Sequence, residues 1–192
     1  GAPEEIRYLH KPHLGTDRLH GIVRHIRQEI LHAGGEVRFG AQMTDVETGM
    51  DGVRAVVVND SERIAAEAVL LGIGHSARDT CQKLLARAVA MMPKAFAVGL
   101  RIEHPQALID RVQYGADAGN PLLPAADYAL TFRDEVTGRG AYSFCMCPGG
   151  LVVAAASEEG HLVTNGMSNY RRDAGTANSA LLVQVTPADF GG

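Results

Sequence analysis

The chain has 192 residues and a formal net charge of −4, with 46% apolar and 21% charged residues. These values are ordinary for a folded globular protein, so they exclude wholesale disorder and allow a sizeable core without disulfides or metals. The weak acidity excludes a broad phosphate-binding face, so nucleic acid is not an expected partner. No stretch approaches the roughly 20 apolar residues of a membrane span, and no membrane association is expected.

Cysteine and histidine usage favours a reducing compartment and argues against a metal site. The cysteines are Cys81, Cys145 and Cys147, and an odd, sparse set is not a disulfide framework. We therefore expect a cytoplasmic protein. His10 and His13 share an irregular segment without a third ligand at a suitable spacing, so no metal is expected.

Residues 16–33 predict an amphipathic helix. Thr16 is the expected N-cap, and Gly34 and Gly35 are expected to end the helix. Apolar residues recur at helical spacing and form one stripe, which consists of Leu19, Ile22, Val23, Ile26 and Ile30.

Short β signals follow this helix and predict a small meander. They lie at residues 36–39, 43–47, 53–58 and 64–68. The apolar run at 69–74 does not alternate and ends in glycine, which is typical of a buried strand entering a tight turn. Ser76 and Asp79 then predict a capping box at the start of a second helix.

The second half of the chain predicts a mainly β region. Pro105 is expected to open a short helix, and residues 114–126 read as a loop. Strands are expected at 96–102, 128–132, 141–146, 151–156 and 180–185. A boundary near residues 91–95 divides the chain into a partial α/β region at 1–93 and a β-rich region at 94–192.

The strand–turn–helix at residues 70–79 is the first candidate site. Gly72 and Gly74 permit close approach of a ligand, and free N–H groups at a helix start can bind an anion. An ordinary turn with a capping serine explains the same residues equally well. A dinucleotide fingerprint is excluded, because the third glycine of Gly-x-Gly-x-x-Gly is missing.

Cys145 and Cys147 are the second candidate site. Their spacing on a strand predicts that both thiols lie on one face, where they could pack, line a cofactor or substrate pocket, hold a metal, or act as a redox pair. The following Gly149 and Gly150 suit a turn that approaches a flat ligand. The polar stretch at 164–173 is either a binding loop or a solvated connector.

Five longer strings bring these observations together. They are 13–17 (HLGTD), 74–80 (GHSARDT), 96–105 (FAVGLRIEHP), 145–150 (CMCPGG) and 163–168 (VTNGMS). With the helix, the meander and the glycine turn, they resemble a bacterial group of FAD-dependent dehydrogenases of the two-dinucleotide-binding type. The resemblance implies an internal part of such a flavoprotein, without its N-terminal Rossmann motif.

The resemblance also implies a fold and a set of cofactor contacts. The fold is of mixed α/β and α+β class: part of an FAD/NAD(P)-binding-type domain, made of a helix and a small β-meander, followed by a mainly antiparallel β domain on the substrate side. The residues implied to lie near FAD are Met43, Thr44, Gly72, Ile73, Gly74, His75, Cys145, Cys147, Gly149, Gly150, Asn165 and Gly166. Ile73 departs from the threonine that the family carries in this turn.

The function implied is part of an FAD-dependent oxidoreductase that transfers a hydride between the flavin and a small substrate. The alternative is a non-enzymatic module of the same fold that binds a small ligand or a partner. No catalytic acid or base stands out in the sequence. Exposed apolar faces of the helix at 16–33 and of the strand at 69–73 predict self-association into a homo-oligomer.

Overall fold

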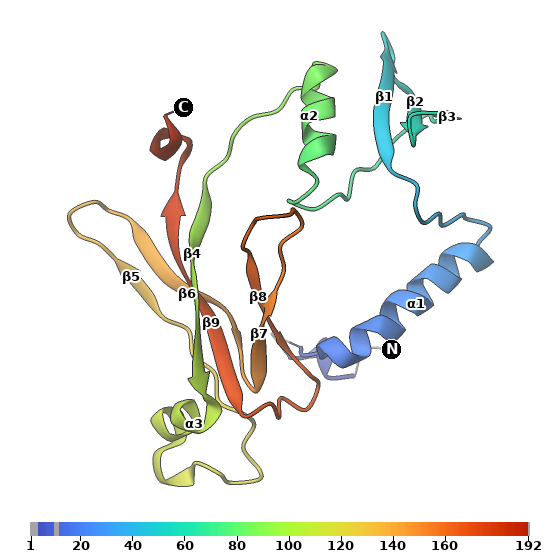
Figure 1. The fold of residues 1–192 in the computed structure, drawn as a ribbon. Coiled ribbons are helices and arrows are strands. Elements are labelled where there is room, and N and C mark those ends of the chain that lie inside the picture. Colours follow the sequence, from blue (N-terminus) through green and yellow to red (C-terminus); the bar gives the residue numbers. More distant parts are fainter. Residues whose placement is uncertain (1–3, 10–11, 192) are drawn as a thin grey trace. The chain divides into compact units, whose positions relative to one another are not determined.

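The computed structural model describes residues 4–9 and 12–191, and His10 therefore lies outside the described residues. The chain divides into two compact units. The sheet unit comprises residues 1–29 and 94–192, and the meander unit comprises residues 30–93. The described residues form three α-helices and three antiparallel sheets, which is an α+β arrangement (Figure 1).

Helix α1 (Thr16–His32) confirms the first predicted helix. Its C-terminal end closes as expected, because Gly34 adopts a φ of 83° and its N–H bonds to the carbonyl of Leu31. The predicted N-cap is wrong. Thr16 is the first helical residue and not the residue before the helix, and its hydroxyl donates to the carbonyl of Ser168.

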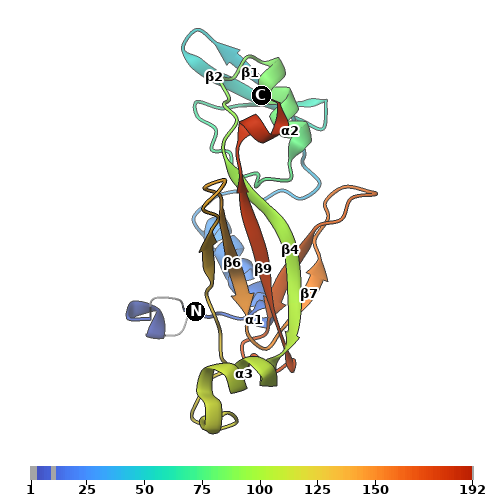
Figure 2. The ribbon, with the colours of Figure 1, turned by 90° about the vertical axis from the view of Figure 1, so that its left-hand side faces the viewer.

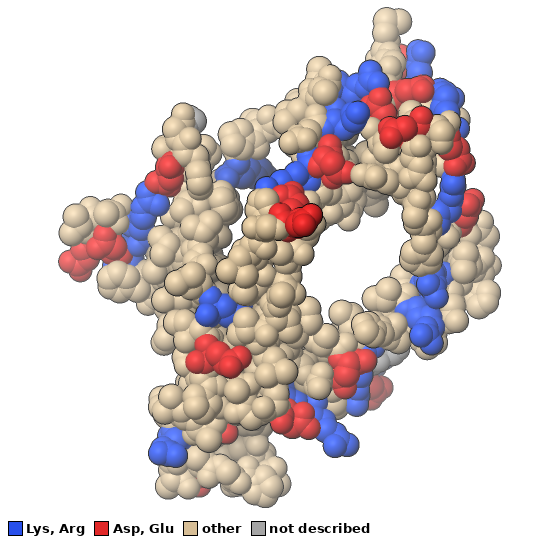
Figure 3. All heavy atoms as spheres, in the orientation of Figure 1, with Lys and Arg blue, Asp and Glu red and all other residues tan. Residues whose placement is uncertain are grey.

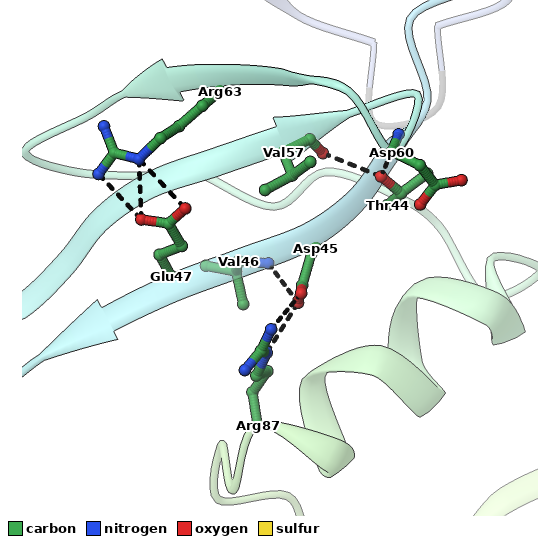
Figure 4. Close-up of polar contacts among 8 residues, drawn as sticks. All are labelled: Thr44, Asp45, Val46, Glu47, Val57, Asp60, Arg63 and Arg87. Carbon is green, nitrogen blue, oxygen red and sulfur yellow. Dashed lines mark hydrogen bonds and ion pairs between the residues drawn. The ribbon is translucent and has the colours of Figure 1, made fainter.

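The meander unit contains the sheet β1 (Met43–Gly49), β2 (Gly52–Val58) and β3 (Glu62–Ala65). The local β signals predicted β1 and β2, whereas β3 begins before and ends before the strand expected at 64–68. Helix α2 (Arg78–Ala86) packs against β1. The side chains buried in this unit are Val46, Ala55, Val58, Thr80 and Leu84. Figure 4 shows two ion pairs that add to this packing, Arg87 with Asp45 and Arg63 with Glu47.

Three predictions for the meander unit are wrong. Residues 36–39 form no strand, and the run at 69–74 is an exposed irregular segment in which Leu70 is 98% exposed. A continuous apolar run becomes a strand only when neighbours cover it on both faces, and no strand among the described residues pairs with this one. The capping box is also absent, because Ala77 is the N-cap and Asp79 accepts a bond from Gln42 Nε2 at 2.7 Å.

The main sheet of the sheet unit has the strand order β4-β9-β6-β5, and every pairing is antiparallel (Figure 2). Its strands are β4 (Phe96–Pro105), β5 (Thr131–Arg133), β6 (Gly140–Cys147) and β9 (Thr176–Val185). The last strand in the chain is thus central. It begins earlier than predicted, since its first residues pair with the end of β4, as Thr176 does with Pro105.

A hairpin and a helix complete the sheet unit. The hairpin is β7 (Gly150–Ala154) with β8 (Thr164–Ser168), so the stretch predicted as a polar loop begins as a strand. Helix α3 (Gln106–Tyr114) follows Pro105 as predicted, and Ile109, Ala126 and Ala177 form the buried cluster beneath it. Three short 3-10 helices are η1 (Glu4–Arg7), η2 (Gly115–Asp117) and η3 (Pro187–Phe190).

The surface carries both signs of charge. On the face drawn in Figure 3, Lys and Arg are interspersed with Asp and Glu, and uncharged residues make up most of the surface. In the part of the chain that the structure describes, no helix has both the length and the apolar character needed to cross a bilayer.

Candidate functional site

A bulge in β6 determines where the two neighbouring cysteines lie. The pairing of β6 with β9 shifts between Phe144 and Cys147, and Cys145 adopts a φ of 45° within the shift. The bulge interrupts the alternation of side chains along β6. The prediction that both thiols lie on one face of the strand depended on that alternation. Cys145 is exposed, whereas Cys147 is half-buried and its thiol donates to the carbonyl of Cys145 at 3.3 Å.

The surroundings of Cys147 favour packing over thiol chemistry. Burial raises the pKa of the Cys147 thiol, and the nearby Arg101 guanidinium only partly opposes this effect. A raised pKa keeps the sulfur protonated, and the thiol is a much weaker nucleophile than the thiolate. This raised pKa therefore does not favour the Cys147 thiol as a nucleophile.

A buried polar pair lies beneath the β7–β8 hairpin. Asn178 is completely buried, and its Oδ1 accepts a hydrogen bond from Arg101 Nη1 at 2.6 Å. The same nitrogen donates to the carbonyl of Cys145 at 3.2 Å. Gly166 on β8 packs directly on this pair, since a Cβ there would lie 2.1 Å from Asn178 Oδ1 and 2.2 Å from Arg101 Nη1.

The glycines of the turn between β6 and β7 also pack against the chain itself. Gly149 has a φ of 54°, and a Cβ there would lie 1.6 Å from the carbonyl oxygen of Arg172. Its N–H donates to Gln106 Oε1 at 2.8 Å. A Cβ on Gly150 would lie 2.6 Å from the carbonyl oxygen of Met167. Each glycine therefore has a role in packing within the sheet unit, and the flavin contacts implied for them stay a prediction.

The structure thus brings five of the implied flavin neighbours together in the sheet unit. These are Cys145, Cys147, Gly149, Gly150 and Gly166, around the end of β6 and the β7–β8 hairpin. Asn165 lies beside them on β8, where it is exposed and its Oδ1 accepts the N–H of Gly166 at 2.8 Å.

The remaining implied residues belong to the meander unit. Met43 pairs with Val58, and the hydroxyl of Thr44 accepts the N–H of Asp60 at 2.9 Å, which fixes the start of β1 (Figure 4). Residues 72–75, including Ile73 and His75, lie in the exposed segment before α2.

The glycines of this segment differ from those of the hairpin, because the space where a side chain would lie is open. A Cβ on Gly72 or Gly74 would meet no atom of the described residues within 4 Å, apart from its chain neighbours. Gly74 also has a φ of 69°, which favours glycine. This backbone is accessible to close approach by another group, whereas the backbone at Gly149, Gly150 and Gly166 is already covered.

A hollow of about 430 Å³ opens on the face of the main sheet next to α3. Its apolar lining includes Ile102, Leu108, Ile109, Val112, Leu130 and Leu181. Its polar lining consists of His104, Gln113, Tyr128, Ser143 and Ser179. His104 Nε2 and the Tyr128 hydroxyl are 2.8 Å apart and share a hydrogen bond, and the two rings meet edge to face.

Sequence reasoning missed this histidine–tyrosine pair. Tyr128 follows His104 by 24 residues, and no helical or strand spacing relates positions that far apart. The one local signal is the alternation of Ile102 and His104, which places both side chains on one face of β4. The tyrosine reaches that face only because the chain returns across the sheet after α3.

Two comparisons with known proteins bear on this arrangement. Residues 95–192, just over half of the chain, match the family model described as "FAD-dependent protein, C-terminal domain-like". A Clostridium beijerinckii protein named "Uncharacterized protein" is 55% identical over 192 residues, which cover 100% of this chain and 36% of the relative. The chain therefore spans about a third of that relative's length.

Proposed function

The chain belongs to the family of FAD-dependent proteins that share this C-terminal domain, and from that premise we propose that it is part of an FAD-dependent oxidoreductase acting on a small molecule. In this proposal, residues 1–93 contribute to the cofactor side and residues 94–192 form the domain on the substrate side. When bound, FAD supplies the hydride chemistry, and the protein supplies orientation and exclusion of water.

The observation that carries the proposal is the open glycine segment before α2. Gly72 and Gly74 leave their backbone uncovered, and the positive φ of Gly74 turns the chain without a side chain in the way. A flat or phosphorylated cofactor needs such close backbone approach. We therefore propose Gly72, Ile73, Gly74 and His75 as the contacts of this chain with FAD, with the start of β1 at Met43 and Thr44 as a second contact.

The test is the flavin content of the full-length protein that contains this chain. After purification with added FAD, the protein should retain bound flavin, seen as its visible absorbance. Gly74→Leu should weaken FAD binding by about tenfold or more, equivalent to roughly 1.4 kcal/mol.

Gly40→Leu is the matched control for this variant. Gly40 lies in the same unit, has a similar φ of 62°, and also has no atom near its missing Cβ. The control should keep its flavin. A well-folded full-length protein without flavin after reconstitution would reject the proposal and favour a binding module without a cofactor.

A further inference from the structure

We infer that the hollow next to α3 binds a small, uncharged and largely apolar molecule that carries one hydroxyl or carbonyl oxygen, with His104 and Tyr128 holding that oxygen. The inference deepens the proposed function and rests on it where this molecule is identified as the substrate. The binding site itself involves only side chains of the sheet unit.

The size and lining of the hollow indicate the apolar part of the ligand. About 430 Å³ is within the range of ligand pockets, which are mostly apolar with a few convergent polar groups. The lining side chains, all within the described part of the chain, include no Asp, Glu, Lys or Arg. An ionised ligand would therefore lose its hydration there without gaining a charged partner.

The serines of the hollow are already engaged. Ser143 Oγ accepts the N–H of Leu130 at 2.7 Å, and Ser179 Oγ donates to the carbonyl of Phe144 at 3.3 Å or of Ala180 at 3.1 Å. A ligand oxygen must therefore find its partner elsewhere in the hollow. Gln113 also lines the hollow but is exposed to solvent, so the half-buried pair of His104 and Tyr128 is the polar group best placed to hold that oxygen.

The chemistry of the pair indicates the oxygen of the ligand. If the Tyr128 hydroxyl donates to Nε2, the Nδ1–H of His104 remains as a donor. If Nε2–H donates to Tyr128, the phenolic O–H remains as a donor. In either tautomer the pair keeps one donor for a hydroxyl or carbonyl oxygen, so recognition does not depend on which proton position is occupied.

Naphthol and methylnaphthalene are suitable probes, because a hydroxyl in one replaces a methyl group of similar size in the other. The measurement is the Kd of each probe for the full-length protein, followed by probe fluorescence. The unmodified protein should bind naphthol about fivefold more tightly than methylnaphthalene, as one hydrogen bond of about 1 kcal/mol implies.

Two variants with matched controls locate the binding. The double variant His104→Leu/Tyr128→Phe removes both donors and should abolish the preference for naphthol, whereas Tyr142→Phe, on β6 and outside the hollow, should keep it. Val112→Asp places a charge in the hollow and should weaken both probes at least about tenfold. Val112 is 73% exposed, so the fold does not depend on it, and Val136→Asp at a 92% exposed site outside the hollow is its control.

The outcomes separate this inference from the proposed function. Bound flavin with equal probe binding in the Val112→Asp and Val136→Asp proteins would overturn the hollow as the site and leave the flavin proposal standing. Probe binding with the expected variant pattern in a protein without flavin would support the site and reject the oxidoreductase. If Val112→Asp lowers the mass in light scattering and neither probe binds, the hollow is covered by a second copy and the inference is wrong.

Discussion

At the scale of single residues, several glycines of the sheet unit permit strands and turns to pack closely against neighbouring segments. A Cβ on Gly99 would lie 1.8 Å from the carbonyl oxygen of Leu181, and one on Gly149 would lie 1.6 Å from that of Arg172. Gly166 similarly leaves room for Arg101 and Asn178. These contacts are with backbone or with a buried pair, neither of which can move aside without disturbing the sheet.

Gly149→Ala is therefore predicted to be severely destabilising, by more than about 3 kcal/mol, because strain of the left-handed backbone adds to overpacking. Gly119→Ala separates the two effects. Gly119 has a φ of 88° with no atom within 4 Å of its missing Cβ, so this variant should lose only about 1 kcal/mol. Urea unfolding of the 192-residue chain measures both. If both variants lose the same free energy of unfolding, the contact of Gly149 with Arg172 contributes nothing to the effect.

At the scale of elements, local patterns predicted the structures that depend on local interactions. The helix at residues 16–33 and the strands β1 and β2 follow from periodicity and turns alone, and these predictions are confirmed. The run at 69–74 reads as a buried strand, yet its conformation depends on neighbours that its own sequence does not specify. The strand β8 was missed for the converse reason, since Thr164 and Asn165 become extended through pairing with β7.

The residues of the candidate site also include some that local sequence could predict and others that it could not. Cys145, Cys147 and the glycines after them are close in sequence, so a shared location was predictable from the chain. The pair of His104 and Tyr128 was not, because it depends on the return of the chain after α3. A bulge such as that at Cys145 is equally invisible in an alternating sequence.

The C-terminal helix η3 gives a pH-dependent prediction. Arg139 bonds to Asp189, and Thr186 N–H donates to the same carboxylate at 2.7 Å, so the pKa of Asp189 is lowered from 3.8 to about 2. A lowered pKa means that the ionised carboxylate stabilises the fold above 3.8 and that this stabilisation is lost as the pH falls towards about 2. The contact also holds Phe190 near Phe96, with ring centroids 5.8 Å apart.

We expect Asp189→Asn to remove this part of the acid sensitivity. The denaturant midpoint of the unmodified chain should fall more steeply between these two pH values than that of the variant. Asp127→Asn, a substitution of the same kind outside this contact, should retain the steep fall. If the denaturant midpoints of all three proteins fall in parallel as the pH is lowered, the role of Asp189 is contradicted. Asp45, for example, is present in all three proteins and contributes equally to each profile.

At the scale of the whole molecule, apolar surface is exposed on several elements. No residue of α1 is buried, and Val23 and Ile26 on its apolar stripe are 58% and 57% exposed. Leu100 on β4 is 79% exposed. We expect these exposed apolar side chains to form an interface, either with other parts of a longer protein or with further copies of the chain.

Light scattering of the 192-residue chain should accordingly give a mass above the 20.4 kDa of one copy. Val23→Glu places a charge on the stripe and should lower the mass. Gln28→Glu introduces the same side chain on α1 away from the stripe and should leave the mass unchanged. A monomeric mass for the unmodified chain would refute the prediction of self-association.

The central place of β9 has a consequence for how the protein is made. Arg101 on β4 finds its partner Asn178 on β9 only 77 residues later in the chain. At the usual synthesis rate of about 5–20 residues per second, about 4–15 seconds pass between the synthesis of Arg101 and that of Asn178. β5 and β6 can form a hairpin during that interval, but β4 remains an unpaired edge with its apolar side chains in water. We therefore expect this sheet to be more open to aggregation during synthesis than in the finished fold.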